Sequence, residues 1–422
     1  MRVCMMEPCA DADAGSIGAF YIREHARRAG YAVDVLRRPK AGYDVELISV
    51  HHCTDYPRVA TLPKLARWRI LGGHPMVNNP RPVIPFADAI CVGEGESWIG
   101  PALRALEATN KIESLAALPG TIICPEHRRG DPLPPANVER PLPDNPPYLN
   151  RPGTLSAAWY VEMARGCPYS CHFCELGHST PFRLYSEDHL RGVLAQADTS
   201  ITRKINFYAP DEASHPKYHE LYAHLRERGF AAGFSSMRID SVLRRGLPDI
   251  PPNMLIRVGI DGMSEEVRQR VNKPITDDSI VRYFSMMLER GHVNFKIFFI
   301  WAYPWEKAAD FKSFERLMKR VMALPLRTNV SLRIKWTPFI PQPCTPLGGE
   351  KPRFDYRMFD RINVWHALNA RPRRNPGWYI ENDGMMSAAT HRRQCEYTLG
   401  DETCLMRLPR AKPLHPQAAD AR

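Results

Sequence analysis

The sequence lacks a long apolar run: no stretch approaches the roughly 18 consecutive apolar residues that a membrane-spanning helix needs. We therefore expect no membrane span. The first eight residues have no apolar segment of the kind that a secretory signal carries, and no internal repeat is visible. Eleven cysteines in such a chain favour a reducing compartment, and hence a cytoplasmic protein, over a framework of disulfides.

Acidic residues are in short supply. The chain has 57 Lys and Arg against 46 Asp and Glu, which gives a formal net charge of +11. A solvated basic surface is one interpretation, and a polyanionic partner such as a nucleic acid is the other. The net charge alone does not distinguish between these two interpretations.

Three cysteines stand close together in residues 164–177, at Cys167, Cys171 and Cys174. Soft thiolates at this C-x3-C-x2-C spacing suit three irons of a 4Fe–4S cluster. A fourth cysteine at matching spacing is missing, so one iron would keep an open position. A zinc site would need four ligands. His172 or His178 could complete one, but no second ligand pair lies nearby.

The order of apolar segments predicts an α/β protein with two main domains. Residues 1–124 alternate strands and helices, which is typical of a doubly wound parallel sheet. Residues 125–152 are rich in proline and read as a linker. In residues 153–349 six strands with intervening helices predict a partial (βα)6 barrel of TIM type, with the cysteine loop at its mouth. Residues 350–422 form an extension with a helix at 354–369 and a disordered tail from 409.

Individual elements follow from the same patterns. We expect strands at 2–6, 31–36, 45–50, 158–163, 204–208, 234–237, 255–260, 293–300 and 331–336, and helices at 14–29, 98–108, 187–195, 215–228, 264–271, 277–290 and 309–322.

The cysteine run closely resembles that of the radical S-adenosylmethionine (SAM) family, and the resemblance covers roughly residues 40–350. It implies that SAM binds the open iron of the cluster. It also implies a one-electron reductant of the flavodoxin or ferredoxin type, and cleavage of SAM to a 5′-deoxyadenosyl radical that abstracts a hydrogen atom.

Two positions near the cysteines match residues that contact SAM in the family. Phe173 stands where relatives place an aromatic beside the adenine; it could also simply cover the barrel mouth. Asp211, followed by Glu212, stands where relatives carry acids that accept hydrogen bonds from the SAM ammonium group. The alternative is an acid at a helix N-terminus.

Three more charged residues match family elements further along. Arg238, in residues 237–240, could hold the methionine carboxylate. Asp261 stands where relatives often have Gly-Ile-Glu, and Lys273 resembles the lysine of their Asn-Lys pair. Each could instead be an exposed loop charge.

The chain departs from the family where glycines are usual, at Ala302, Trp305 and Cys344. The first two replacements are expected to reshape the substrate side of the pocket. Cys344 could donate a hydrogen atom, although an inert thiol is favoured.

The first domain resembles the cobalamin-binding domain of one radical SAM branch, through residues 72–74 and 87–96. The Asp-x-His-x-x-Gly motif that supplies a histidine to cobalt is absent, so bound cobalamin stays open. A methylthiotransferase is a lesser alternative, in which Cys9, Cys53 and Cys91 would hold a second cluster. Four residues near the C-terminus could close over the barrel mouth, although an ordinary surface segment is favoured: Arg392, Arg393, Cys395 and Cys404.

Three outcomes compete for the reaction itself. The basic charge favours modification or rearrangement of a nucleobase or nucleic acid, as by an isomerase that hypermodifies phage thymidine. The alternative is methyl transfer through cobalamin to a peptide or natural product. The third is a degenerate scaffold without catalysis, against which the intact cysteines argue.

Overall fold

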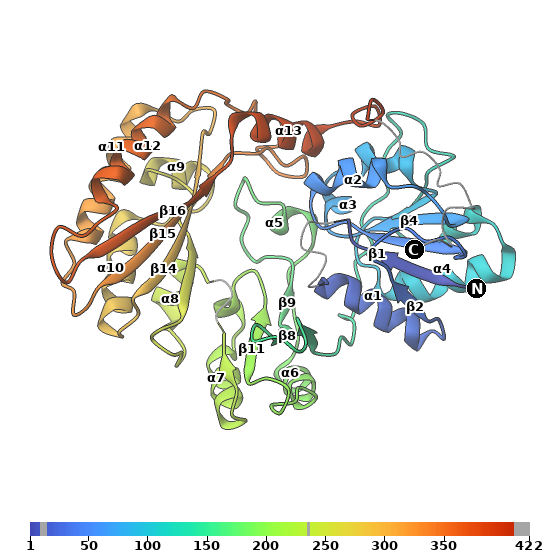
Figure 1. The fold of residues 1–422 in the computed structure, drawn as a ribbon, viewed down its shortest axis with the longest axis horizontal. Helices are drawn as coiled ribbons and strands as arrows, with labels where there is room; N and C mark the ends of the chain where they lie inside the picture. The colour runs from blue at the N-terminus through green and yellow to red at the C-terminus, as the bar shows by residue number, and fades with distance from the viewer. Residues whose placement is uncertain (9–14, 234–236, 409–422) are drawn as a thin grey trace, which may run out of the picture. The chain divides into compact units, whose positions relative to one another are not determined.

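The computed structural model describes residues 1–8, 15–233 and 237–408, and it divides the chain into two compact units (Figure 1). One comprises Met1–Ser156 and the described part of Gln394–Arg422; the other is Ala157–Arg393. No helix in the described ranges is long and apolar enough to cross a bilayer. Cys9 and the predicted tail from 409 lie outside the described residues.

The first unit is built on a six-stranded sheet in the order β2-β1-β3-β4-β5-β6, in which all neighbours are parallel except β5 and β6. This confirms the predicted doubly wound sheet. Its strands are β1 (Val3–Met6), β2 (Val33–Val35), β3 (Val45–Ser49), β4 (Trp68–Gly72), β5 (Ala89–Cys91) and β6 (Thr121–Ile123).

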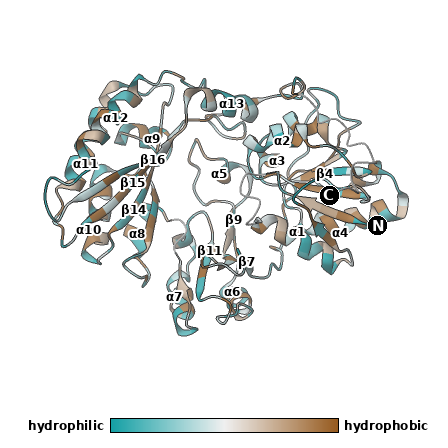
Figure 2. Ribbon diagram, viewed as in Figure 1, coloured by the Kyte–Doolittle hydropathy of each residue, from teal (hydrophilic) through white to brown (hydrophobic). Residues whose placement is uncertain are grey.

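Both faces of this sheet are covered because its strands are apolar on both sides, as the brown ribbons of β1 and β4 indicate in Figure 2. Helices α1 (Ile17–Arg28) and α4 (Glu96–Thr109) pack on one face. Helices α2 (Tyr56–Thr61) and α3 (Pro75–Asn78) pack on the other. In the linker, residues 125–147 form no helix and only one isolated bridge, Gly93–Asn137, before β7 (Tyr148–Asn150).

The second unit holds two groups of parallel strands. The first contains β8 (Ala158–Glu162), β11 (Lys204–Tyr208) and β12 (Ala231–Ala232). The second has the order β13-β14-β15-β16: β13 (Leu255–Gly259), β14 (Asn294–Trp301), β15 (Val330–Pro338) and β16 (Trp378–Met385). The predicted strand 234–237 falls largely outside the described residues.

Strand β16 corrects the prediction for the C-terminal extension. We expected residues 350–422 to contribute one helix, and α12 (Arg357–Asn369) is that helix. The extension also adds β16, paired in parallel with β15, and α13 (Ala388–Leu399). Apolar and polar residues alternate at the start of β16, Trp-Tyr-Ile-Glu, but the preceding Arg-Pro-Arg-Arg-Asn-Pro-Gly run reads as a loop and obscured it.

The remaining elements of this unit are β9 (Ala164–Arg165), β10 (Arg183–Leu184), α5 (Leu176–Ser179), α6 (Glu187–Ala195), α7 (Tyr218–Glu227), α8 (Ile239–Arg245), α9 (Glu265–Arg270), α10 (Asp277–Glu289) and α11 (Ala308–Met322). Helix α11 shows how they attach: Phe311, Phe314, Leu317, Met318 and Val321 recur at helical spacing and are buried.

Phe314 is the centre of the aromatic core between α11 and the sheet. Its ring is 5.3 Å from that of Phe299 and 5.2 Å from that of Trp336, and it has no exposed surface. Phe314→Ala should therefore lower the free energy of unfolding by about 3–5 kcal/mol. Urea denaturation followed by tryptophan fluorescence measures this. Lys312→Ala, an exposed change on the same helix, should shift it by less than about 0.5 kcal/mol.

Candidate functional site

The cysteine loop follows β8 and β9, and two glycines allow it to fold back on itself. Gly166 has φ +67°, and a Cβ there would lie 2.4 Å from the Pro181 carbonyl oxygen. A Cβ at Gly177 would lie 2.0 Å from the Tyr169 carbonyl oxygen. Any larger residue at either position would force the loop open.

The loop brings the thiols of Cys167, Cys171 and Cys174 together. Burial, together with the neighbouring thiols, raises the pKa of Cys167 and raises that of Cys174 to about 11. The backbone N–H groups of Tyr169 and Leu176 partly offset this by facing the two sulfurs. Because metal ligation needs thiolates, iron binding here would release protons.

The donor set fits a cluster better than zinc. One ring nitrogen of each histidine lies against the backbone: His178 Nε2 is 3.1 Å from the Cys171 carbonyl and His172 Nδ1 is 3.2 Å from the Arg270 carbonyl. Nowhere in the described ranges do three His, Cys, Asp or Glu side chains converge as around a single metal ion. In a cubane each thiolate binds a different iron, so such convergence is not required.

Asp211 links the cysteine loop by hydrogen bonds to the segment that contains Arg238 and Ser241. It follows β11 and has no exposed surface. Its Oδ2 accepts hydrogen bonds from the hydroxyls of Tyr169 at 2.8 Å and Ser241 at 2.6 Å, and its Oδ1 accepts one from the Arg238 N–H at 3.2 Å. Contact of Asp211 with SAM therefore stays a prediction, since protein donors already occupy both oxygens. The neighbouring Glu212 is equally buried and accepts a hydrogen bond from Tyr222.

Arg238 lies beside the cysteines, and its role toward the SAM carboxylate stays a prediction. Its Nη1 donates to Cys171 Sγ at 3.3 Å. Its Nε and Nη2 donate to the two carboxylate oxygens of Asp240, at 2.9 and 3.2 Å, and its guanidinium lies 3.9 Å from the centre of the Tyr169 ring. The hydrogen bonds to Asp240 and Cys171 keep the pKa of Arg238 above its ordinary value despite burial. Asp240 thus fixes the position of the Arg238 guanidinium, whose positive charge lies next to the Cys171 thiol.

Asp261 and Lys273, predicted separately, form an ion pair in which Nζ lies 2.5 Å from Oδ2. Their side chains are 13% and 8% exposed, so the alternative of freely exposed loop charges does not hold. The pair lies over Gly259 at the end of β13, where a Cβ would come within 2.5 Å of Asp261 Oδ2. Their roles toward SAM stay predictions.

Phe173 packs in an apolar cluster that ties the cysteine loop to the ends of β14 and β15. Its neighbours are Val267, Val271, Ile300, Tyr303, Trp305, Phe339 and Leu347. Burial, with the nearby charges of Asp261, Glu306, Cys171 and Cys174, raises the pKa of Tyr303 well above its ordinary value. Tyr303 therefore lies close to both the ion pair and the cysteines.

The departures from the family alter this same region. Ala302 takes φ +62°, a conformation that favours glycine, and its N–H donates to Glu306 Oε2 at 2.6 Å. Burial raises the pKa of Glu306 to about 8. Trp305 stacks on Tyr303 with ring centres 5.4 Å apart, and the Arg270 guanidinium lies 4.0 Å from the Trp305 ring. Cys344 is half-buried, and burial raises its pKa to about 11.

Cys53 and Cys91, the two described members of the proposed second cluster, do not lie together. Cys91 is buried among residues on one face of the sheet, and Cys53 among those on the other. Burial raises the pKa of Cys91 strongly, so its thiol stays protonated. Cys395 is buried and Cys404 half-buried, and both belong to the first unit.

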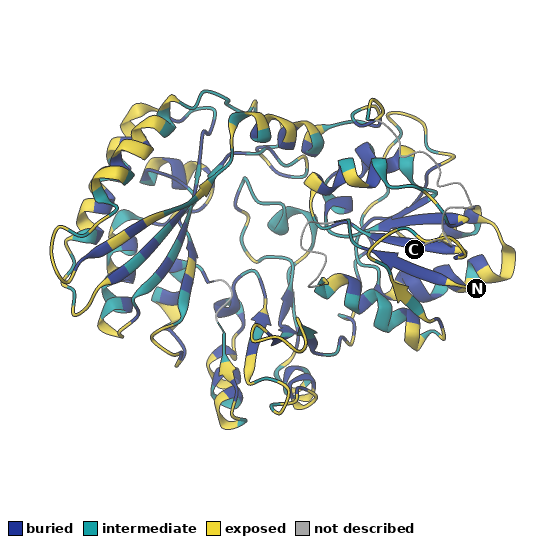
Figure 3. Cartoon of the chain, in the orientation of Figure 1, coloured by how far each residue is buried: buried dark blue, intermediate teal, exposed yellow. Residues whose placement is uncertain are grey.

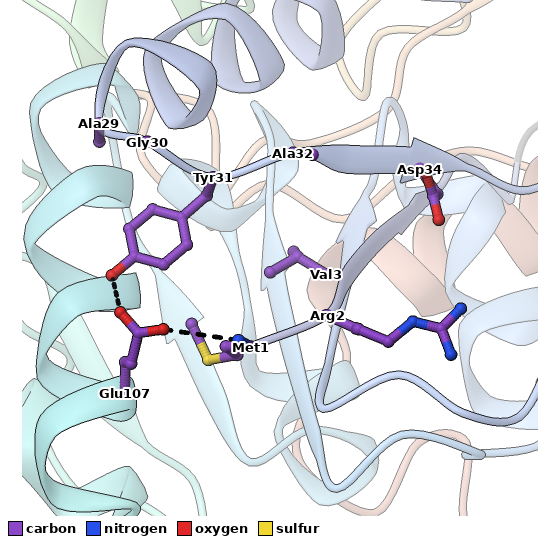
Figure 4. A pocket seen from close by; sticks show the side chains of 9 residues that line it. All are labelled: Met1, Arg2, Val3, Ala29, Gly30, Tyr31, Ala32, Asp34 and Glu107. Atoms are coloured by element: carbon purple, nitrogen blue, oxygen red, sulfur yellow. Dashed lines mark hydrogen bonds and ion pairs between the residues drawn. The ribbon is translucent and has the colours of Figure 1, made fainter.

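At the carboxyl edge of the first sheet, His51 pairs with Glu7, with Nε2 and Oε2 2.7 Å apart. The Glu7 carboxylate, which accepts from the His51 ring, raises the pKa of His51. A cavity of 360 Å³ lies instead at the amino ends of β1 and β2, where Met1, Arg2, Tyr31, Asp34 and Glu107 are among its lining residues (Figure 4). Ligands of open α/β sheets bind at the carboxyl edge, so this cavity is not the expected site.

Sequence reasoning missed Tyr169, Asp240 and Ser241. A tyrosine between two ligand cysteines was a usable signal, because a phenol on a short loop needs a hydrogen-bond partner when buried. Nothing in the sequence indicated Ser241, because its hydrogen bond to Asp211 forms only when the fold brings α8 next to that residue.

Tyr169→Phe tests the hydrogen bonds to Asp211. The ring beneath Arg238 is kept, but a buried carboxylate loses a donor, so the free energy of unfolding should fall by about 1–3 kcal/mol. Thermal denaturation of the purified protein measures this. An equal loss in Tyr379→Phe, an exposed tyrosine of the same unit, would contradict the assignment.

Comparison with known proteins supports the fold. No protein-family model matches the chain. MJ0966, an uncharacterized protein of Methanocaldococcus jannaschii, is 24% identical over 379 residues, which cover 85% of this chain and 78% of that protein. The hopanoid C-3 methylase of Methylococcus capsulatus is 28% identical over 189 residues, 37% of this chain and 35% of the methylase.

Among solved structures, the cobalamin-dependent SAM radical enzyme OxsB, with aqua-cobalamin and SAM bound, superposes with a TM-score of 0.53 at 16% identity. The match covers 77% of this chain but only 52% of OxsB, so the chain matches about half the length of that protein. The chain thus has a cysteine run similar to that of the radical SAM enzymes, and its fold is similar to that of OxsB.

Proposed function

We propose that this protein is a cobalamin-dependent radical SAM enzyme that methylates an unactivated carbon of a small molecule. The observation that carries the proposal is the C-x3-C-x2-C loop, whose three grouped thiols and lack of a fourth cysteine leave a cluster iron open. The fold shared with OxsB, a cobalamin-dependent SAM radical enzyme, supports the cofactors, and the similarity to a hopanoid methylase supports methyl transfer. They do not support the nucleobase isomerase that the basic charge suggested. Methyl transfer through cobalamin, the alternative function, is therefore the one we propose.

Cys167, Cys171 and Cys174 would hold the cluster, which when bound supplies the electron that splits SAM into methionine and the 5′-deoxyadenosyl radical. Arg238 and the Asp261–Lys273 pair would orient the amino acid part of SAM, and Phe173 would lie against the adenine. The apolar cluster around Tyr303 would exclude water from the reactive carbon.

Cobalamin, which would carry the methyl group, is proposed to bind at the carboxyl edge of the first sheet. The fit there is limited in one respect. His51 Nε2 is paired with the Glu7 carboxylate at 2.7 Å, so this nitrogen is already engaged. We therefore propose that cobalamin would bind there without coordination by His51 Nε2.

Cys171→Ala should abolish the brown absorbance of the reconstituted cluster and all SAM cleavage, because one iron loses its ligand. Anaerobic reconstitution, iron analysis and chromatography of 5′-deoxyadenosine measure both. Cys344→Ala, which removes a half-buried thiol outside the motif, should keep its iron content. SAM cleavage at the wild-type rate by Cys171→Ala would overturn the cluster assignment.

Cobalt analysis tests the cobalamin part. Protein refolded or expressed with hydroxocobalamin should retain about one cobalt per chain after gel filtration, and His51→Ala should retain the same amount. The absence of cobalt from protein that still cleaves SAM would leave radical chemistry in place and exclude cobalamin-dependent methyl transfer.

A further inference from the structure

The four-stranded sheet of the second unit has one face on which, over most of its length, none of the described helices packs. Along β14 and β15 buried residues alternate with partly exposed ones, visible as bands in Figure 3. The buried side chains, such as Phe295, Phe299 and Trp336, pack against α10 and α11. In a barrel of this type the helices lie outside, so the uncovered face is the inner one.

Positive side chains form a row across this inner face. Arg257 of β13 is in register with Lys296 of β14, which is in register with Arg333 of β15. Lys335 follows two residues after Arg333 and so points to the same side. Neighbouring strands lie about 4.8 Å apart, so the row of three cations spans roughly 10 Å.

These charges are only partly compensated within the chain. Lys296 pairs with Asp383 of β16, and Glu381 is in register with Arg333. The hydrogen bond from Lys296, with the charges of Lys335 and Arg333, holds the pKa of Asp383 below its ordinary value. Across the described ranges, Arg257, Arg333 and Lys335 form no ion pair, so four cations face two carboxylates.

Like charges directly opposite each other on a sheet are destabilising. The arrangement costs folding free energy, and a bound anion would offset that cost. A single carboxylate would contact only one arginine of the row. A row of this width instead matches an anion whose several negative charges are distributed over a similar length. The carboxylates on edge strand β16 limit the row at one side, which suits a small anion better than an extended polyanion.

The inner face becomes more apolar toward the carboxyl ends of the strands. Phe298 is in register with Lys335, and Ile300 with Thr337. Ile300 packs in the cluster that contains Phe173 and Trp305, beside the cysteine loop. A ligand with its anionic group on the cations would therefore extend an uncharged part toward the cysteines.

From this geometry we infer that the inner sheet face binds a phosphate or diphosphate group of the substrate, through Arg257, Lys296, Arg333 and Lys335. The inference rests on the proposed function, because it makes this group the anchor of the molecule that is methylated. It narrows the substrate to a phosphorylated small molecule whose reacting carbon lies beyond the anionic end.

Inorganic pyrophosphate is the probe, because it binds without SAM or cluster chemistry. Isothermal titration of the full chain at constant ionic strength should show saturable binding, stronger for pyrophosphate than for phosphate or acetate. Arg333→Gln and Lys335→Gln should each weaken it at least tenfold. Lys319→Gln, an exposed lysine on the outer helix α11, should leave it unchanged.

The outcomes distinguish a phosphate site for a small molecule from a nucleic-acid site and from the absence of an anion site. Equal pyrophosphate affinity in wild type and in both variants overturns the proposal, and so does an absence of saturable binding. Stronger binding of a single-stranded oligonucleotide than of pyrophosphate, lost in the same variants, would replace the small molecule with a nucleic acid. Circular dichroism shows that the variants fold. Pyrophosphate binding by a chain that fails to cleave SAM would sink only the proposed function, and SAM cleavage without pyrophosphate binding only this inference.

Discussion

The arrangement around the cysteines depends on one buried carboxylate. Asp211 has no exposed surface, and a buried charge persists only where hydrogen bonds replace its hydration. The donors come from three segments: Tyr169 from the cysteine loop, the backbone of Arg238, and Ser241 from α8. Satisfying this one group therefore fixes the distance between the loop and the helix. The loop has little regular structure of its own, so the position of the thiols follows from this constraint.

Arg238 benefits from the same constraint. Its backbone is held by Asp211, and two of its guanidinium nitrogens donate to Asp240, which leaves Nη1 to meet Cys171. Hydrogen bonds and positive charge near cluster sulfurs stabilise the reduced, more negative state of an iron–sulfur centre. Arg238, to which the resemblance assigns a role in SAM binding, would thus also be placed to adjust the electron affinity of a cluster held by these cysteines.

The sequence predicted those parts of the structure whose signals are local. The doubly wound first sheet, the barrel-type strands and the cysteine loop follow from apolar periodicity and one motif, and helix α6 begins and ends where the pattern places it. Strand β16 was missed because the arginines and prolines before it resemble a loop. The pairing of Asp261 with Lys273 and the convergence on Asp211 were not predictable, because each joins residues from separate elements whose approach depends on the whole fold.

The two faces of the β13–β16 sheet are selected by different forces. The helix-covered face carries Phe295, Phe299 and Trp336 because burying aromatic surface stabilises the fold. The inner face contributes little to that burial, so its residues are free to serve binding, and there Arg257, Lys296 and Arg333 lie side by side at an electrostatic cost. Stability alone would remove such a row or pair each cation with an acid, as β16 does only for Lys296. The uncompensated cations lie on the amino side of the apolar cluster, which lies at the carboxyl ends of the strands beside the cysteines. This polarity along the strands would give a bound anionic molecule one preferred direction, with its charged end away from the cysteines.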